Sequence, residues 1–261
     1  MNRIQLILVL GAIAVVVLIY QLPRVVVEND QVQEVASTES HSLEVPDKVN
    51  AQIVELRRLL KEEINTDKKS NFAHSLARRY LDYGILDSAA YYGNLLEKWE
   101  EGPSSKAADV YFTAFERAPN SEKAKTYAEK SRSIIEKLLE KDPTNLLLKN
   151  RLAMTLVISE NPMAGIAALR EILVIDEANR QAILNLGLLS IQSGQFDKAK
   201  ERFEKLVSLN SADYEAKLYL AVSMMEINQE EKARQLLEEI IATQDSIPAI
   251  KMMAGDYLKS L

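Results

Sequence analysis

The sequence predicts an all-α chain, in which an N-terminal transmembrane helix precedes an α-solenoid of about five helix pairs and a C-terminal capping helix. Small residues recur every 34 positions, at Ala153, Gly187, Ala221 and Gly255. A fixed period of that length is typical of stacked helix pairs. Residues 4–22 form an uncharged apolar run, which predicts the transmembrane helix. The helix-breaking residues Gly and Pro are few, at 8 and 7 of 261 residues.

The composition excludes several classes of function. The chain is 47% hydrophobic and 27% charged, which is ordinary for a globular protein. It has no cysteine, so disulfides and thiolate sites are excluded. From residue 25 onward, 30 basic residues stand against 38 acidic ones, which argues against a nucleic-acid-binding surface.

The apolar run over residues 4–22 is long enough to cross a bilayer, because about 20 apolar helical residues span the hydrocarbon core. A cleaved signal peptide is the alternative, but it normally ends in small residues. Here Gly11, Ala12 and Ala14 lie in the middle of the run. We therefore predict an uncleaved anchor over residues 1–23, through which the protein contacts the membrane.

The orientation of the anchor follows from its flanking charges. Arg3 lies on the N-terminal side, whereas Arg24 is followed closely by Glu28 and Asp30. The positive-inside bias therefore places the N-terminus in the cytoplasm. The predicted localisation is the bacterial inner membrane, as a single-pass protein whose C-terminal domain is periplasmic. The opposite topology, with a cytoplasmic repeat domain, remains open.

The segment after the anchor is predicted to be a polar linker over residues 24–46, followed by an amphipathic helix and connector over residues 47–69. Apolar residues recur at three- and four-residue steps along residues 47–64, as on one face of a helix. Asp47 is a plausible N-cap, and residues 65–71 are predicted to break the helix.

The solenoid is predicted over residues 70–261. Its helix pairs are 72–83 with 87–99, 105–118 with 121–141, 146–159 with 162–176, 180–193 with 195–209, and 213–227 with 229–243; residues 248–261 form the capping helix. The second pair is irregular, because the period would place Pro119 inside a helix, where proline is costly.

The units resemble tetratricopeptide repeats (TPRs). The fourth unit carries Leu186, Gly187, Gly194, Phe196, Ala199, Phe203 and Leu206 at that family's positions; the third carries Leu152, Ala153, Leu156, Gly165, Leu169 and Ile172; the fifth carries Leu220, Ala221, Ala233, Leu237 and Ile240, with Asn228 replacing the turn glycine. The resemblance covers roughly residues 71–261. It implies that the small residues let the first helix of a pair press against the second.

The resemblance also implies a binding groove lined by the first helix of each pair. Its predicted residues are Asn150, Met154, Val157, Leu184, Leu188, Ile191, Leu218, Val222 and Met225. This set is apolar apart from Asn150, so the paired Lys and Asn residues with which some TPR domains hold a C-terminal carboxylate are missing. An apolar groove accepts an amphipathic helix or an extended apolar segment of a partner. Alternatively, the helix at residues 47–64, an end of the solenoid or a second copy of the chain fills it.

Catalytic residues, a metal site and a cofactor are not predicted, and neither is a small-molecule substrate. The only histidines are His41 and His74, and no nucleophile or phosphate-loop motif occurs. We interpret His74 as a partly exposed helix residue rather than a base.

The predicted function is therefore that of a non-enzymatic, membrane-anchored scaffold or chaperone-like accessory factor that docks a protein partner, such as a membrane-complex subunit or a secreted client. The architecture resembles bacterial inner-membrane TPR proteins associated with the Sec translocon or cytochrome c assembly. The alternative is a constitutive structural subunit of a multiprotein envelope complex, with its groove permanently occupied.

Overall fold

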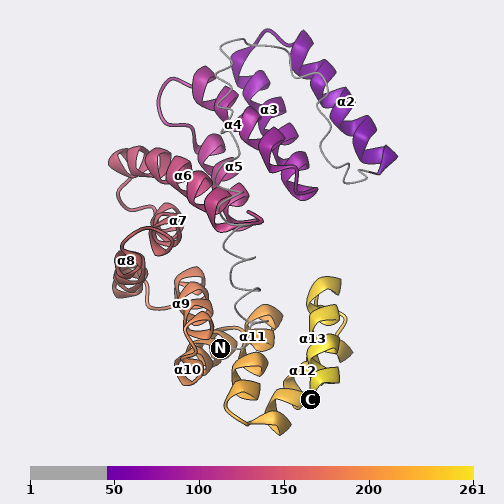
Figure 1. Cartoon of the computed structure of the whole chain (residues 1–261), viewed down its shortest axis with the longest axis vertical. Helices are drawn as coiled ribbons and strands as arrows, with labels where there is room; N and C mark the ends of the chain where they lie inside the picture. Colours follow the sequence, from indigo (N-terminus) through magenta and orange to yellow (C-terminus); the bar gives the residue numbers. More distant parts are fainter. Residues whose placement is uncertain (1–45) are drawn as a thin grey trace, which may run out of the picture. The chain divides into compact units, whose positions relative to one another are not determined.

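The computed structural model describes residues 46–261, and every regular element in this part is an α-helix (Figure 1). The helices are α2 (Asp47–Glu62), α3 (Thr66–Asp82), α4 (Leu86–Trp99), α5 (Ser105–Glu116), α6 (Ser121–Lys141), α7 (Leu146–Val157), α8 (Pro162–Ile175), α9 (Arg180–Gln192), α10 (Phe196–Leu209), α11 (Tyr214–Glu226), α12 (Glu230–Ala242) and α13 (Pro248–Ser260). The anchor and all of the linker except Pro46 lie outside the described residues. Within residues 46–261, no helix is both long and apolar enough to cross a membrane.

The helices pack in chain order, each against the next. This arrangement confirms the predicted pairs α3 with α4, α5 with α6, α7 with α8, α9 with α10 and α11 with α12, and α13 packs on α12 and α11 as a cap. Helix α6 is long, at 21 residues, and Pro119 lies in the turn before it, as the slip of the period predicted.

Two expectations about the N-terminal helices were wrong. Residues 65–71 do not form a break, because α3 begins at Thr66, where the Asn65 side chain accepts a hydrogen bond from the Lys68 amide. Asp47 is not the N-cap of α2 either: it lies in the first turn, after Pro46. The connector between α2 and α3 is therefore only about three residues long, and it holds the two helices together.

The first helix of each pair starts with a side-chain cap, whereas the second follows a tight turn. The caps are Asn65, Ser104, Asn145, Asn179 and Asp213, each accepting from the amide three residues later; Asn120 caps α6 in the same way. Such caps satisfy amides that have no partner within the helix. The turns use a positive φ at Gly84 (70°), Gly194 (70°) and Asn228 (59°), which confirms that Asn228 replaces a glycine.

Small residues allow the paired helices to touch. A Cβ built on Gly187 in α9 would lie 2.5 Å from Cζ of Phe203 in α10. A Cβ on Gly165 in α8 would lie 2.5 Å from the backbone oxygen of Ala153 in α7. Gly255 differs, because nothing lies within 4 Å of its Cβ position: no further helix follows α13 in the described chain.

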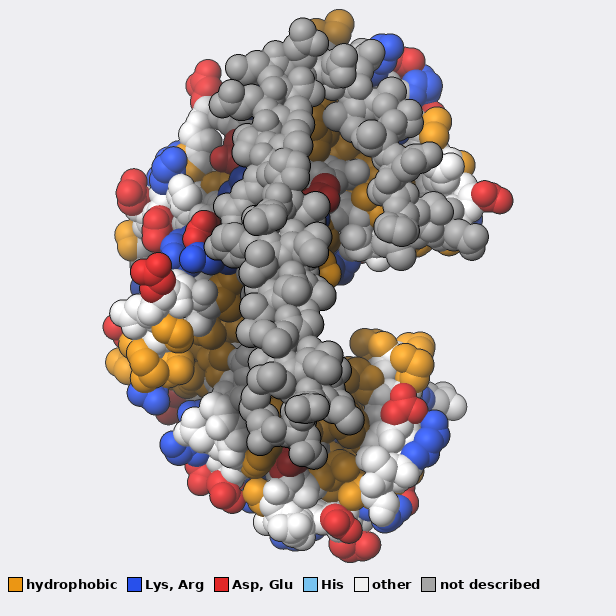
Figure 2. Space-filling model, viewed as in Figure 1, with side chains coloured by type: hydrophobic (Ala, Val, Ile, Leu, Met, Phe, Trp, Pro, Cys, Tyr) orange, Lys and Arg blue, Asp and Glu red, His pale blue; other side chains and the backbone are white. Residues whose placement is uncertain are grey.

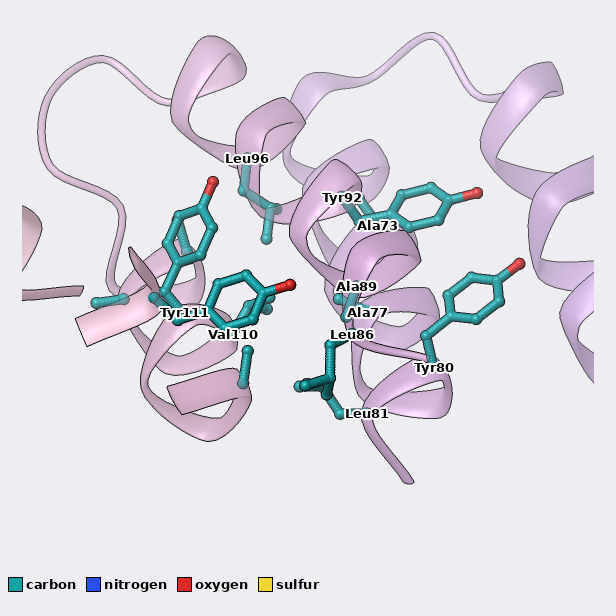
Figure 3. Close-up of a cluster of buried hydrophobic side chains, with 14 of the residues drawn as sticks. Ala73, Ala77, Tyr80, Leu81, Leu86, Ala89, Tyr92, Leu96, Val110 and Tyr111 are labelled. Carbon is teal, nitrogen blue, oxygen red and sulfur yellow. The ribbon is translucent and has the colours of Figure 1, made fainter. Parts of the chain in front are cut away.

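The buried side chains fall into successive clusters along the row of helices. The first cluster joins α2 to α6; Figure 3 shows its side chains from α3, α4 and α5, including Tyr80 and Tyr92, whose rings stack at 5.8 Å. The last cluster joins residues from α9 to α13, and a smaller cluster around Ala153 and Leu169 lies between them. Tyr91, next to Tyr92 on α4, is 52% exposed.

Candidate functional site

The first helices of the pairs form the inner side of the stack. Besides its sequence neighbours, α3 contacts α5, α7 contacts α9, and α9 contacts α11. The second helices show no comparable contacts with one another within residues 46–261. In a curved stack the helices on the inside are closest together, so these first helices carry the concave surface with which solenoids bind their partners.

Charged side chains link α3, α5 and α7 on this inner side. Asp109 of α5 accepts hydrogen bonds from Arg151 of α7 at 2.7 Å and Arg78 of α3 at 3.2 Å, and its Oδ2 lies 3.1 Å from His74 Nε2. Hydrogen bonds from His74 and Arg151 lower the pKa of Asp109 well below its usual range. Asp109 therefore stays ionised and holds three helices together.

Glu116, one helical turn beyond Phe112 on α5, has the opposite electrostatic behaviour. Partial desolvation raises the pKa of Glu116, which is an exposed residue overall, although Arg151 and Arg117 nearby act in the other direction. The Arg151 guanidinium lies 5.2 Å from the centre of the Phe112 ring, in cation–π contact. Arg151 is paired with Asp109, and Glu116 has no ion pair within 4 Å among the described residues.

Asn150 of α7 continues the polar surface toward α9. Its Nδ2 donates to the Leu146 carbonyl at 3.0 Å and to Asn179 Oδ1 at 3.1 Å. The side chain is only 2% exposed, and its Oδ1 has no hydrogen-bond partner among the described residues. Buried acceptors without a hydrogen-bond partner are uncommon in native structures, so this oxygen is an unusual feature of α7.

A cleft opens between α5, α7 and α9, with a volume of about 190 Å³. It is lined by Phe112, Glu116, Leu147, Asn150, Arg151, Met154, Gln181 and Asn185. Leu147 at the rim is 59% exposed, whereas Asn185 is 6% exposed. The cleft thus combines carboxamide groups with apolar surface.

The predicted groove residues occupy four different places. Asn150 and Met154 line the cleft. Leu184 and Leu218 are core residues, 4% and 1% exposed, and Leu188, Ile191 and Met225 pack on the same cluster. Val222 is half-buried on α11. Val157 faces α8: its Cγ2 lies 2.7 Å from the Cβ position of Gly165.

Sequence reasoning missed the polar half of the inner side, although a signal for it existed. Leu184 and Leu188 lie 10 and 6 residues before the turn residue Gly194. His74 and Arg78 lie at the same distances before Gly84, so they hold the same positions in the first unit. The inner side is therefore charged and polar near α3 to α7 and apolar near α9 and α11.

The outer side carries an apolar patch on α8. Met163, Val174 and Ile175 are 60%, 88% and 62% exposed. Figure 2 shows hydrophobic side chains gathered at the position of α8 in Figure 1. An exposed patch of large aliphatic side chains often marks a contact with another protein.

Metal chemistry finds no support in the described part of the chain: between residues 46 and 261, no group of His, Asp and Glu side chains is placed to hold a metal ion. On the inner side, the Asp109 carboxylate binds Arg78 and Arg151. This surface offers hydrogen bonds, charge and apolar contact area.

Comparison with known proteins supports a repeat fold. A tetratricopeptide repeat family model matches residues 190–255. A thermophilic TPR protein of Thermus thermophilus is 18% identical, with a TM-score of 0.53, over 68% of this chain and 91% of that protein. A tetratricopeptide repeat protein of Parabacteroides merdae is 15% identical, with a TM-score of 0.54, over 81% of this chain and 82% of that protein.

No curated protein matches the chain. At these identities the solved structures bear on the fold alone. Residues 190–255 thus match the model of that repeat family, and the described chain has an all-α fold similar to that of the two solved TPR proteins.

Proposed function

We propose that the protein is a non-enzymatic scaffold that docks a partner protein on the inner side of its helix stack. The observation that carries the proposal is the cleft between α5, α7 and α9, because it combines the exposed carboxamide of Gln181 with exposed apolar surface on Leu147. Polar groups that fix orientation within an apolar surround are typical of a binding site.

The proposal extends to the cellular setting. Residues 4–22 anchor the chain in the bacterial inner membrane, and the helix stack docks its partner on the periplasmic side. Anchoring raises the effective concentration of the stack near membrane partners, such as subunits or clients of a secretion or cytochrome c assembly system. Digestion by added protease in spheroplasts, but not in intact cells, tests this topology. Protection in both preparations would place the stack in the cytoplasm.

Site-specific photo-crosslinking in intact cells of the native host tests the docking surface. A photoreactive amino acid is placed at Leu147, Leu188 or Val222 on the inner side, with exposed Lys137 on α6 as the matched control. We expect the inner positions to form the same crosslinked species and Lys137 to form none. Crosslinks from Lys137 alone would show that the inner side is not the docking surface.

The apolar patch on α8 favours a second candidate, a constitutive subunit of an envelope complex, because so much exposed aliphatic surface suits a permanent contact. The same crosslinker at Val174 separates the two candidates. A subunit gives a crosslink from Val174 at fixed stoichiometry that survives detergent and salt. An accessory factor gives substoichiometric crosslinks that exchange with free partner.

A further inference from the structure

Two hollows adjoin each other on the outer side of the stack, along α4. One, of about 360 Å³, is lined by α4 and α6, and the other, of about 430 Å³, is lined by α4 alone. Tyr91 and Asn94 line both hollows, so they form one continuous surface, which we call the Tyr91 surface. Both side chains are open to solvent: Tyr91 is 52% exposed, and Asn94 is an exposed residue as well.

The exposed ring of Tyr91 is supported by buried aromatic neighbours. The rings of Tyr91 and Tyr92 meet edge to face, with their centres 5.2 Å apart. Tyr92 is only 7% exposed and stacks in turn on Tyr80 of α3. An aromatic face that is held in this way can bind a partner at a low cost in conformational entropy.

The polar group next to this ring is a donor. Asn94 Oδ1 accepts hydrogen bonds from the Tyr111 hydroxyl at 2.7 Å and from Lys130 Nζ at 3.2 Å. A lysine ammonium only donates, so the atom that faces Lys130 must be the carboxamide oxygen. The other atom is therefore Nδ2, whose two N–H groups have no hydrogen-bond partner within residues 46–261.

The charges around the Tyr91 surface balance. The first hollow is lined by one acid and one base, Asp87 and Lys123, and the second by Glu97 and Lys98. Asp87 is also occupied, because it accepts hydrogen bonds from Lys123 Nζ at 2.9 Å and from the Tyr127 hydroxyl at 3.0 Å. The surface therefore suits an uncharged ligand that brings an acceptor for Asn94 and an apolar group for Tyr91.

A proline-rich chain has both features. An α-helix bonds nearly all its carbonyls internally, whereas a polyproline II helix has no internal hydrogen bonds and its prolines carry no N–H. The spacing also fits: side chains three residues apart on a helix, such as Tyr91 and Asn94, lie about 5–6 Å apart. A polyproline II helix rises about 3.1 Å per residue, so a proline ring and a carbonyl one or two residues away can reach both.

We propose that the Tyr91 surface binds a proline-rich segment of a partner protein in the polyproline II conformation. A proline ring packs on the Tyr91 ring, and a nearby backbone C=O accepts from Asn94 Nδ2. Such segments bind aromatic-lined grooves because they are already ordered before they bind. This contact lies on the outer side of the stack and does not depend on the docking surface of the inner side.

The test uses the full chain in a mild detergent and a fluorescently labelled peptide of nine prolines, whose binding is followed by fluorescence anisotropy. The matched probe is a labelled peptide of nine residues that alternate between glycine and serine. It is uncharged and has free carbonyls, but it has neither the rings nor the preformed helix. We expect nonaproline to bind saturably and the glycine–serine peptide to show no binding at the same concentrations.

Two variants test the two contacts. Tyr91→Ala should weaken the binding of nonaproline about tenfold, because the ring contact is lost, whereas Tyr91→Phe should leave it unchanged. Asn94→Asp keeps an oxygen for Tyr111 and Lys130 but replaces the donor by a second acceptor, so it should weaken binding about five- to tenfold. Val174→Ala, which shortens another exposed side chain of the outer side, is the control and should have no effect. Circular dichroism shows that the variants are folded.

Three results would overturn the proposal: no saturable binding of nonaproline at millimolar concentration, equal binding of the two peptides, or unchanged binding of nonaproline to either Tyr91→Ala or Asn94→Asp. None of them bears on the crosslinks from Leu188 and Val222. The failure of this outer contact and the failure of the proposed docking function are therefore separate outcomes.

Discussion

Gly187 in α9 leaves just enough room for the ring of Phe203 in α10, which is fully buried. Gly255 in α13 holds the same place in the 34-residue period but faces open space. A methyl group therefore has opposite consequences at the two positions. At Gly187 it forces the ring to move, whereas at Gly255 it only restricts the unfolded chain.

We expect Gly187→Ala to lower the free energy of unfolding by about 1–3 kcal/mol through overpacking. Gly255→Ala should raise it by about 0.5–1 kcal/mol, because alanine loses less backbone entropy in a helix. The urea concentrations at the midpoints of unfolding measure both effects, if the free energy of unfolding depends on urea with the same slope in the two variants. Equal changes in the free energy of unfolding for the two variants would contradict the close contact of Gly187 with α10.

Asp109 and Glu116 make opposite contributions to the pH dependence of stability. The folded pKa of Asp109 lies below its unfolded value of about 3.9, so its contribution is present above that pH and is lost as the pH falls toward the folded pKa. The folded pKa of Glu116 is raised, so ionising Glu116 weakens the folded state as the pH rises past about 4.3.

We therefore expect Asp109→Asn to cost about 1–3 kcal/mol at pH 7, and this loss should shrink below pH 4. Glu116→Gln should leave the stability unchanged or increase it at pH 7. Denaturant titrations at pH 7 and pH 3.5 provide the measurement. A loss for Asp109→Asn that is the same at both pH values would show that the charge of Asp109 is not what joins the three helices.

Among the elements, α2 is the one whose place the sequence left open. It was a candidate to fill the groove, but it packs against α3, at the N-terminal end of the described stack. Ile53 is 4% exposed in that contact, and the Arg57 guanidinium lies 5.8 Å from the centre of the Tyr80 ring. Helix α2 therefore covers the apolar side of α3 and does not occupy the surface of α7, α9 and α11.

Ile53 and Val54 are neighbouring aliphatic residues of α2, of which the first is buried and the second exposed. We expect Ile53→Ala to cost about 2–5 kcal/mol in the stability of the α2–α3 contact, because it removes a buried side chain. Val54→Ala, at a position 58% exposed, should have almost no effect. Amide hydrogen exchange in α2 and α3 reports the change. The placement of α2 would be wrong if both variants exchanged like the unaltered chain.

At the scale of the whole described chain, the buried side chains do not form one continuous core. Large clusters at the two ends of the row are joined through a small cluster around Ala153 and Leu169. In a repeat array each unit is stabilised mainly by its neighbours, so distant units open independently.

Shortening a buried side chain at one end of the row of helices should therefore destabilise that end only. Ile135→Ala in α6 should speed amide exchange in α3 to α6, and Leu237→Ala in α12 should speed it in α10 to α13, with little change at the other end in either case. Hydrogen exchange followed by mass spectrometry resolves the two regions. Uniform acceleration along the chain in both variants would instead indicate a single cooperative unit.

Short-range sequence signals were sufficient to predict the helices and their pairing. The 34-residue period, the turns at Gly84 and Gly194 and the interruption at Pro119 act over a few neighbouring residues, so the elements they predict agree with the structure to within a few residues. The first turns of α3 were missed because the capping bond of Asn65 outweighs the polar composition of residues 65–71.

The candidate site depends on contacts between units, which no local rule describes. His74, Asp109 and Arg151 are 35 and 42 residues apart in sequence and meet only because three inner helices stack. Asn150 of α7 and Asn185 of α9 likewise line one cleft. The sequence by itself determined the repeat fold and the pairing of its helices. Only tertiary packing decided which side chains on the first helices are core and which are joined to one another, because those contacts form between units that are distant in sequence.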